Sequence, residues 1–207
     1  MGTTWDVATP RGLARVHLDV PDNEPAGLLV LGHGAGGGPD APDLLAARDG
    51  ALAAGLSVAR VEQPWRVAGR RVAEAPAHLD TAWLAVVGTL TPAGPLMLGG
   101  RSSGARVACR TAGALGAAGV LALAFPLVPP GRTASRRDEL LLPEVPRLVV
   151  QGSRDAFGVP EPAEGVRVEL VDGADHAFAV RRSDGRSRPE ALMQVRTVVR
   201  EWLQSVT

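Results

Sequence analysis

The sequence has 207 residues, 45% of them hydrophobic, and equal numbers of basic and acidic side chains give it no formal net charge at pH 7. This length and composition fit one soluble globular domain, which we expect to span residues 1–207. The balanced charge argues against nucleic acid as the main partner, because neutralising phosphates needs an excess or a patch of basic residues.

The sequence shows no pattern for a membrane span, a disulfide or a metal site. No apolar run reaches the length of a bilayer span, and Met1–Pro10 lack the basic-then-apolar layout of a signal peptide. Cys109 is the single cysteine, and no Cys/His cluster has the spacing of zinc ligands. We therefore expect a cytoplasmic monomer or small homo-oligomer that binds no membrane, no metal and no cofactor.

The chain begins with the pattern of a β-hairpin. Thr4–Thr9 and Ala14–Val20 alternate apolar and polar side chains on either side of a Pro-Arg-Gly turn. After the hairpin, short continuous apolar runs alternate with longer amphipathic segments. The apolar runs predict six buried strands: Gly27–Leu31, Ser57–Val61, Pro95–Leu98, Gly119–Phe125, Arg147–Val150 and Val166–Val171.

The amphipathic segments predict helices between and after these strands: Pro42–Ala54, Ala77–Leu90, Ser102–Leu115 and Pro189–Ser205. Ser187 is a suitable N-cap for the last of them. Strands that are apolar on both faces belong in a parallel sheet covered by helices on both sides. We therefore predict an α/β fold with about eight strands, mostly parallel, and an antiparallel hairpin at the N-terminus. The remaining stretches are expected to be irregular and too short for a lid domain: Gln63–Ala75, Pro126–Pro146 and Arg181–Arg188.

One serine stands in the pattern of a nucleophile elbow. Gly100-Arg101-Ser102-Ser103-Gly104 follows an apolar run and opens a predicted helix, which is the strand–turn–helix context that G-x-S-x-G requires. The serine needs a tight, strained turn to raise its Oγ above the sheet, and glycines let the strand and helix approach that closely. The pattern predicts Ser102 as the nucleophile of a serine hydrolase.

A carboxylate and a histidine follow two later strands. Asp155 comes shortly after the fifth apolar run, and His176 lies in the loop after the sixth. With Ser102 they stand in the chain order nucleophile, acid, base that this class of hydrolase uses. We predict His176 as the general base and Asp155 as the acid that orients it. Asp175 is a weaker candidate for the acid, because a sequence neighbour cannot readily reach its own adjacent imidazole.

The glycine-rich segment Gly32–Gly38 directly follows the first apolar run. Acyl transfer develops negative charge on the carbonyl oxygen, and two preorganised N–H donors stabilise it. We assign one donor to the backbone N–H of Ala35, with Gly34 as the fallback, and the other to Ser103. These residues would form the oxyanion hole.

The same glycines also match the G-x-G-x-x-G fingerprint of dinucleotide-binding proteins, with Glu62 ending the next strand. That fingerprint needs a helix to begin within the glycines, whereas Pro39 and Pro42 delay it here. A nucleotide cofactor is therefore disfavoured. The chain also has no Lys for a P-loop.

Four residues near the predicted strand ends are expected to shape the pocket: His33, Trp65, Arg66 and Arg101. Ligands of α/β sheets bind at the carboxyl ends of the strands, and these residues follow or end such strands. The basic segment Arg181–Arg188 is interpreted as a solvated loop.

Several of these motifs resemble the short α/β-hydrolase family that includes a testis-expressed protein and a subunit of a chromatin acetyltransferase complex. The chain resembles dienelactone hydrolases more distantly. The motifs that carry the resemblance are Leu31–Gly36, Leu98–Gly104, Phe125–Leu127, Val149–Gly158 and Gly173–His176. The resemblance implies an α/β-hydrolase fold without a lid and a Ser-Asp-His site at Ser102, Asp155 and His176, but it implies no substrate.

The sequence therefore predicts a serine hydrolase that cleaves a small carboxylic ester or thioester through an acyl-enzyme. The alternative is a non-catalytic binding or scaffold protein on the same fold, because fold does not imply function.

Overall fold

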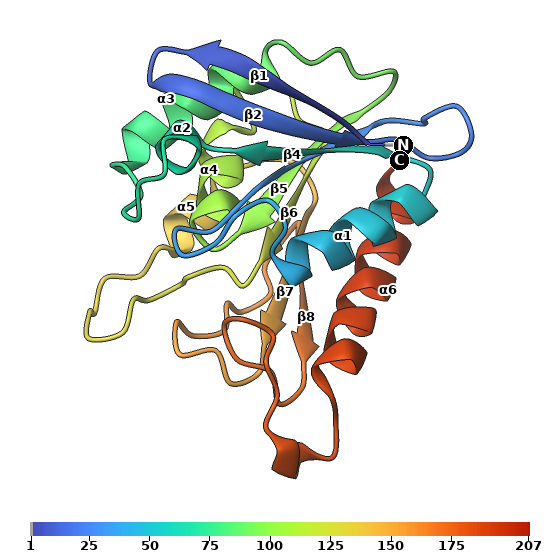
Figure 1. Cartoon of the computed structure of the whole chain (residues 1–207). Coiled ribbons are helices and arrows are strands. Elements are labelled where there is room, and N and C mark those ends of the chain that lie inside the picture. The colour runs from blue at the N-terminus through green and yellow to red at the C-terminus, as the bar shows by residue number, and fades with distance from the viewer. Residues whose placement is uncertain (1) are drawn as a thin grey trace.

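The structure is a computed structural model that describes residues 2–207, apart from the side chain of Arg182. Eight strands form one sheet in the order β1-β2-β4-β3-β5-β6-β7-β8 (Figure 1). The strands are β1 (Thr3–Thr9), β2 (Gly12–Asp19), β3 (Leu28–Gly32), β4 (Ser57–Glu62), β5 (Leu96–Arg101), β6 (Gly119–Leu123), β7 (Arg147–Gly152) and β8 (Val166–Val171). β2 is antiparallel to both β1 and β4, and every pair from β4 to β8 is parallel. The predicted fold class is confirmed.

The helices are α1 (Pro42–Ala53), α2 (Pro64–Val67), α3 (Pro76–Val87), α4 (Ser103–Thr111), α5 (Arg137–Leu141) and α6 (Arg188–Val206), with a 3-10 turn η1 (Arg182–Asp184). Three of them begin at a proline, whose fixed φ suits a first helical position. α6 begins with a capping box between Ser187 and Glu190, which confirms the predicted cap. Within residues 2–207, no helix combines the length and the apolarity that crossing a membrane would need.

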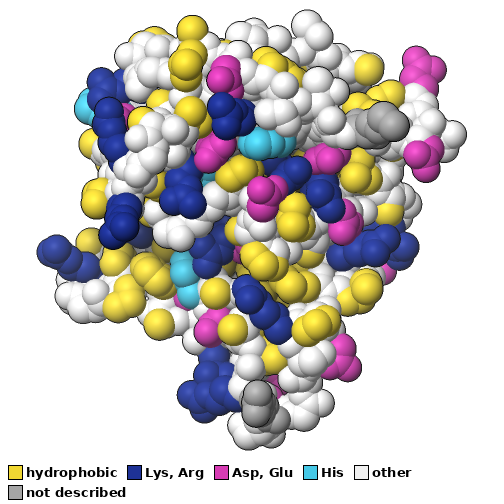
Figure 2. Space-filling model, in the orientation of Figure 1, with side chains coloured by type: hydrophobic (Ala, Val, Ile, Leu, Met, Phe, Trp, Pro, Cys, Tyr) yellow, Lys and Arg dark blue, Asp and Glu magenta, His cyan; other side chains and the backbone are white. Residues whose placement is uncertain are grey.

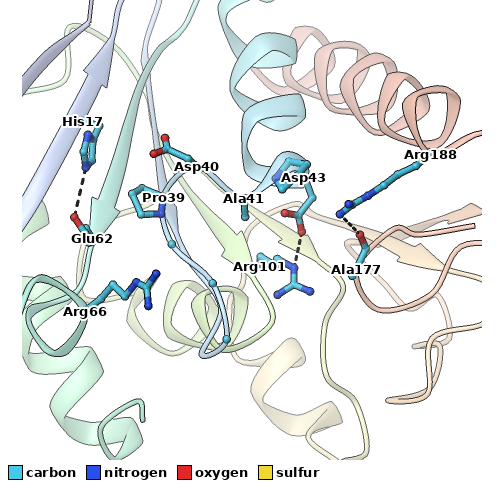
Figure 3. A pocket seen from close by; sticks show the side chains of 14 residues that line it. His17, Pro39, Asp40, Ala41, Asp43, Glu62, Arg66, Arg101, Ala177 and Arg188 are labelled. Carbon is cyan, nitrogen blue, oxygen red and sulfur yellow. Dashed lines mark hydrogen bonds and ion pairs between the residues drawn. The ribbon is translucent and has the colours of Figure 1, made fainter. Parts of the chain in front are cut away.

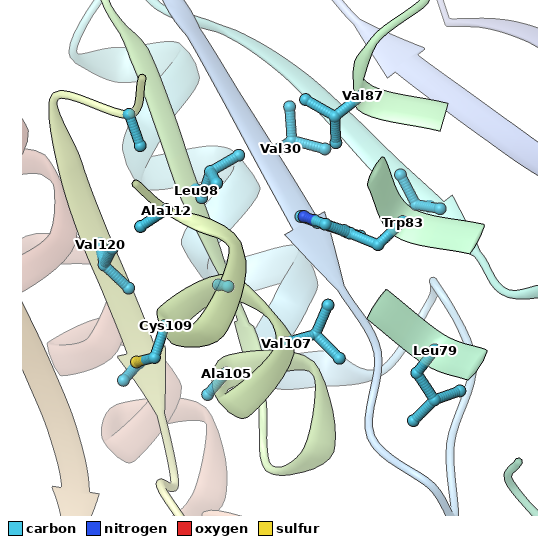
Figure 4. Close-up of a cluster of buried hydrophobic side chains, with 14 of the residues drawn as sticks. Val30, Leu79, Trp83, Val87, Leu98, Ala105, Val107, Cys109, Ala112 and Val120 are labelled. Carbon is cyan, nitrogen blue, oxygen red and sulfur yellow. The ribbon is translucent and has the colours of Figure 1, made fainter. Parts of the chain in front are cut away.

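Helices cover both faces of the sheet. α1 and α6 pack side by side on one face, and α3 and α4 lie on the other (Figure 1). On the α3/α4 face, Trp83 and Val107 pack over Val30 and Leu98 of the central strands (Figure 4). On the opposite face, buried side chains of α1 and α6 join those of the same strands: Leu29, Leu31, Leu44, Val195, Val199 and Trp202. The central strands of the sheet are therefore buried on both faces.

The structure differs from the sequence-based prediction mainly at the connections. Two stretches expected to be irregular contain the short helices α2 and α5, and η1 lies in the third. β5 and β7 run past their apolar segments, because glycines and Gln151 continue the backbone pairing to Arg101 and Gly152. α4 ends at Thr111, before Gly113 and the left-handed Gly116.

β3, β5 and α4 meet where no side chain fits between them. A Cβ added to Gly100 would lie 2.4 Å from the carbonyl oxygen of Gly32, and one added to Gly104 would lie 2.2 Å from the same atom. These are backbone contacts, so no side chain can rotate away to relieve them. The two glycines of G-x-S-x-G are therefore required by the packing of strand and helix.

We expect Gly104→Ala to lower the free energy of unfolding by at least about 2 kcal/mol, because overpacking at a rigid contact typically costs about 1–3 kcal/mol. Gly113→Ala is the matched control, since a Cβ added there meets nothing within 4 Å. Urea denaturation of both variants measures the difference. Equal stability of the two variants would contradict the conclusion that β3, β5 and α4 leave no room for a side chain at Gly104.

Candidate active site

Ser102 occupies a strained turn between β5 and α4. Its φ of 53° and ψ of −111° lie outside the regions that L-residues ordinarily populate. Its N–H donates to the carbonyl oxygen of Leu123 at the end of β6, at 2.9 Å, which holds the turn against the sheet. Such strain persists only where the surroundings enforce it, and here the glycine contacts of β3, β5 and α4 do so.

The three residues predicted as nucleophile, acid and base lie together at the carboxyl ends of their strands. His176 Nε2 lies 3.1 Å from Ser102 Oγ, and His176 Nδ1 lies 2.8 Å from Asp155 Oδ2. Because an ionised carboxylate only accepts hydrogen bonds, Nδ1 carries the proton of the neutral ring. Nε2 is then free to accept a hydrogen bond from the Ser102 hydroxyl. This chain of contacts has the geometry of a nucleophile–base–acid triad.

Two groups fix Asp155 for this contact. Its side chain is fully buried, its Oδ1 accepts from the N–H of Phe157 at 2.9 Å, and its Oδ2 accepts from Gln151 Nε2 at 2.8 Å. Gln151 is fully buried near the end of β7, and its Nε2, whose two N–H groups these acceptors share, also lies 3.1 and 2.9 Å from the Phe125 and Gly158 carbonyl oxygens. The Phe157 ring packs on the His176 imidazole with centroids 4.2 Å apart. Sequence reasoning gave Gln151 and Phe157 no role.

The loop that carries His176 packs against the loop that carries Asp155. A Cβ on Gly152 would lie 2.4 Å from the Ala174 carbonyl oxygen, and the Arg154 N–H donates to that same oxygen at 2.9 Å. Asp175 turns its carboxylate away from the imidazole, because Oδ1 accepts from the N–H groups of Ala177 and Ala179 at 2.8 and 2.9 Å. The structure therefore brings Asp155, rather than Asp175, to His176.

The glycine-rich loop after β3 is held from behind by His33. The Gln63 N–H donates to His33 Nε2 at 3.1 Å, so Nδ1 carries the ring proton and donates to the Gly34 carbonyl oxygen at 2.9 Å. A trans peptide points its N–H away from its carbonyl oxygen, so this bond also fixes the direction of the Ala35 N–H. In the described residues, neither the Ala35 N–H nor the Ser103 N–H donates to the protein.

Burial lowers the pKa of His33, although its bond to the Gly34 carbonyl opposes this shift. Only 3% of the residue is exposed, and its ring packs edge-on against the buried Trp65 at 5.4 Å. The imidazole is therefore neutral, and its two hydrogen bonds hold the backbone of the glycine-rich loop to that of Gln63.

A cavity of about 520 Å³ is lined by Gly36–Asp43 and by the chain neighbours of the predicted nucleophile and base, Arg101 and Ala177 (Figure 3). Ser102, Asp155 and His176 themselves do not line it. Of the four residues expected to shape the pocket, Arg66 and Arg101 line this cavity, whereas His33 and Trp65 are buried behind the loop. Arg188, from the segment expected to be a solvated loop, reaches the cavity and donates to the Ala177 carbonyl at 3.0 Å.

Charges around the site are mixed. Figure 2 shows basic and acidic side chains interspersed over this face of the molecule, without a continuous patch of one sign. Carboxylates line the cavity together with the arginines: Asp40, Asp43 and Glu62. No group of three or more His, Cys, Asp or Glu side chains suited to a metal occurs in the described part of the chain.

An eight-stranded α/β sheet with a serine on an elbow after its fifth strand, and with an acid and a histidine after later strands, defines the α/β-hydrolase class. The chain belongs to this family: the family model described as alpha/beta hydrolase domain matches residues 25–204. No curated protein matches the sequence.

Solved structures share the fold over nearly their whole length. A serine hydrolase homologue from Coxiella burnetii has a TM-score of 0.74 at 18% identity, covering 97% of both chains. A serine hydrolase without a lid from Xanthomonas campestris has a TM-score of 0.71 at 19% identity, covering 97% of this chain and 94% of its own. Dienelactone hydrolase from Anabaena variabilis has a TM-score of 0.75 at 17% identity, covering 100% and 98%. Identities this low show the shared fold alone.

The neutral, buried His33 predicts a pH dependence of stability. Its lowered pKa means that, below about pH 6.5, the unfolded chain binds a proton that the native state does not, so stability rises with pH there. We expect His33→Asn to show a shallower fall in Tm on acidification than the parent protein. His78→Asn is the control, because its side chain is 47% exposed. Parallel Tm curves for the parent and His33→Asn would contradict this account of His33.

Proposed function

We propose that this protein is a serine hydrolase that cleaves a small carboxylic ester or thioester through an acyl-enzyme. The observation that carries the proposal is the continuous contact from Ser102 Oγ through His176 to Asp155, with distances of 3.1 and 2.8 Å, on a serine held in a strained elbow. A strained φ at a polar residue is found where function requires the side chain in one place.

The first half of the reaction would be acyl transfer to the enzyme. Ser102 Oγ attacks the substrate carbonyl carbon while His176 Nε2 takes the hydroxyl proton, and the ionised Asp155 stabilises the resulting imidazolium. The carbonyl oxygen becomes an oxyanion that accepts hydrogen bonds from the N–H groups of Ala35 and Ser103. Collapse of the tetrahedral intermediate then breaks the bond to the leaving group, which receives the proton from His176.

The second half would be hydrolysis of the acyl-enzyme. His176, neutral again, removes a proton from a water molecule as that water attacks the acyl carbonyl. The same N–H donors hold the second oxyanion. Its collapse breaks the bond between the acyl carbon and Ser102 Oγ, releases the carboxylic acid, and Oγ takes the proton back from His176. The three stretches expected to be irregular contain only α2, α5 and η1 and none of them holds a lid domain, so we expect water to reach this intermediate.

A buried and fully hydrogen-bonded Asp155 favours the enzyme over a scaffold protein on the same fold. Keeping a carboxylate buried is unfavourable unless it is paired, and the one ion-pair partner of Asp155 among the described residues is His176. The finer resemblance to the short hydrolases that include a testis-expressed protein stays a prediction, and so does the choice between oxygen esters and thioesters.

Ser102→Ala tests the proposal. We expect kcat for a reactive short-chain ester to fall by about 10⁶-fold, as for loss of a triad serine, while the thermal unfolding curve shows a folded protein. Ser103→Ala is the matched control, because it keeps the backbone N–H, and its loss should stay below about tenfold. Hydrolysis by Ser102→Ala at the parent rate would refute the nucleophile.

Asp155→Asn tests the acid. An asparagine at this position can donate to Nδ1 and so favour the wrong tautomer of His176, which lowers kcat by about 10⁴-fold in a triad enzyme. Asp175→Asn is the control, because its Oδ1 can still accept from Ala177 and Ala179, and we expect it to lose less than about tenfold. A larger loss in Asp175→Asn than in Asp155→Asn would transfer the orienting role to Asp175.

A further inference from the structure

Arg101 occupies the variable position of the elbow, and its side chain contacts three separate parts of the site. It ends β5 directly before Ser102, and its side chain is only 15% exposed. Nε lies 2.7 Å from Asp43 Oδ2 in the first turn of α1, and Nη2 donates to the His176 carbonyl oxygen at 3.0 Å. The third nitrogen, Nη1, lies next to Gly34 of the glycine-rich loop. A Cβ added to Gly34 would lie 2.8 Å from it.

The partner of Arg101 is an unusually buried carboxylate. The Asp43 side chain is 3% exposed, and its other oxygen accepts from the Leu44 N–H at 3.1 Å. Burial raises the pKa of the Asp43 carboxyl, and the nearby Arg101 guanidinium opposes this shift. Burying an ion pair in place of apolar side chains seldom adds stability. We therefore infer that this pair serves to hold Arg101 in a fixed position.

Arg110, in the helix α4 that follows Arg101 and Ser102, forms a second ion-pair network with different partners. Arg110 near the end of α4 forms a two-bond pair with Asp80 of α3, at 2.7 and 2.8 Å, and also contacts Glu139 of α5. All these partners are helix side chains, and none belongs to the triad or to the glycine-rich loop. This network joins helices, whereas Arg101, paired with Asp43 in Figure 3, directly precedes the nucleophile in the chain, donates to the base segment and lies next to Gly34.

We propose that Arg101 is a positioning residue for the base, with Asp43 as the ion-pair partner that keeps its guanidinium in place. The proposal rests on the function proposed above. Because Arg101 is the chain neighbour of Ser102, its bond to the His176 carbonyl fixes the spacing of nucleophile and base through the backbone, independently of the Ser–His contact. The carboxylate of Asp43, with Oδ2 2.7 Å from Nε, holds the guanidinium at this place by charge attraction, and Nη2 donates to that carbonyl. Asp43 also neutralises a cation that would otherwise stand uncompensated at the backbone of His176.

The test compares Arg101→Ala with Arg110→Ala, each of which removes an arginine from a partly buried ion pair. The first measurement is the rate of covalent labelling by a fluorophosphonate probe. We expect about a 10²-fold slower reaction in Arg101→Ala, the usual effect of misplacing reacting groups by about 1 Å, and the parent rate in Arg110→Ala. With a neutral short-chain ester, kcat should fall and KM should stay within about twofold, since a positioning residue does not touch substrate. Guanidinium chloride at concentrations far below those that unfold proteins should accelerate Arg101→Ala only.

The double variant Asp43→Asn/Arg101→Ala keeps the test decisive if Arg101→Ala alone does not fold. It removes both charges of the buried pair, and we expect it to be labelled as slowly as Arg101→Ala, because the two residues act as one unit. Labelling of a folded Arg101→Ala or of the double variant at the parent rate would overturn the proposal. A raised KM with an unchanged kcat would also overturn it, since Arg101 would then bind substrate.

Hydrogen exchange separates failure of this proposal from failure of the proposed function. The amides of Ala177 and Ala179 donate to Asp175 inside the loop that Arg101 holds. They should exchange faster in Arg101→Ala than in the parent protein or in Arg110→Ala. A parent protein that the probe does not label would refute the hydrolase, and the exchange rates would still decide the positioning role. Unchanged exchange in Arg101→Ala would refute that role.

Discussion

The contact among β3, β5 and α4 is the constraint on which the site depends. At the Gly32 carbonyl, the backbones of strand and helix come so close that Gly100 and Gly104 cannot carry a Cβ. The single turn between them must therefore be very tight, and Ser102 adopts a left-handed φ of 53° that ordinary packing would not produce. The rigid sheet thus holds the strained serine, with its hydroxyl directed to one point above the strand ends.

The other parts of the site are held by the same kind of backbone proximity. Gly152 lets the loop of His176 lie directly on the loop of Asp155, and Phe178, in the first of these loops, also takes a positive φ of 52°. Asp155 is fixed by Gln151 and by the Phe157 N–H, so the imidazole has one acceptor to bind. A catalytic group positioned by buried neighbours needs no reorganisation when charge develops, which is where most of the stabilisation in such sites arises.

The sequence predicted the features that depend on residues close together in the chain. The elbow around Ser102 needs strand, glycine and helix in immediate succession, and the apolar runs located Asp155 and His176 after the right strands. The same runs predicted six of the eight strands. Five of them are buried on both faces, which leaves an apolar stretch in the sequence, but β8 was wrongly expected to be buried: it lies at the edge of the sheet, and its Leu170 is 46% exposed.

The supporting contacts could not be found in this way. Asp43 resembles an ordinary acidic residue in the first turn of a helix, and only the fold brings it to Arg101, 58 positions later in the chain. His33 was expected to shape the pocket, but its ring turns inward to Gln63, a contact 30 positions away. Short helices such as α5 have too few residues for a periodic pattern, so their stretches were expected to be irregular.

The central claim is that the strained serine of the elbow is the reactive group of this protein. Peptide mass spectrometry after treatment with a fluorophosphonate tests it most directly, because the adduct remains on the residue that attacked the probe. The account predicts one stoichiometric adduct, on Ser102, and none after heat unfolding, when the elbow no longer exists. An adduct on another side chain, or equal labelling of the folded and unfolded chain, would contradict it.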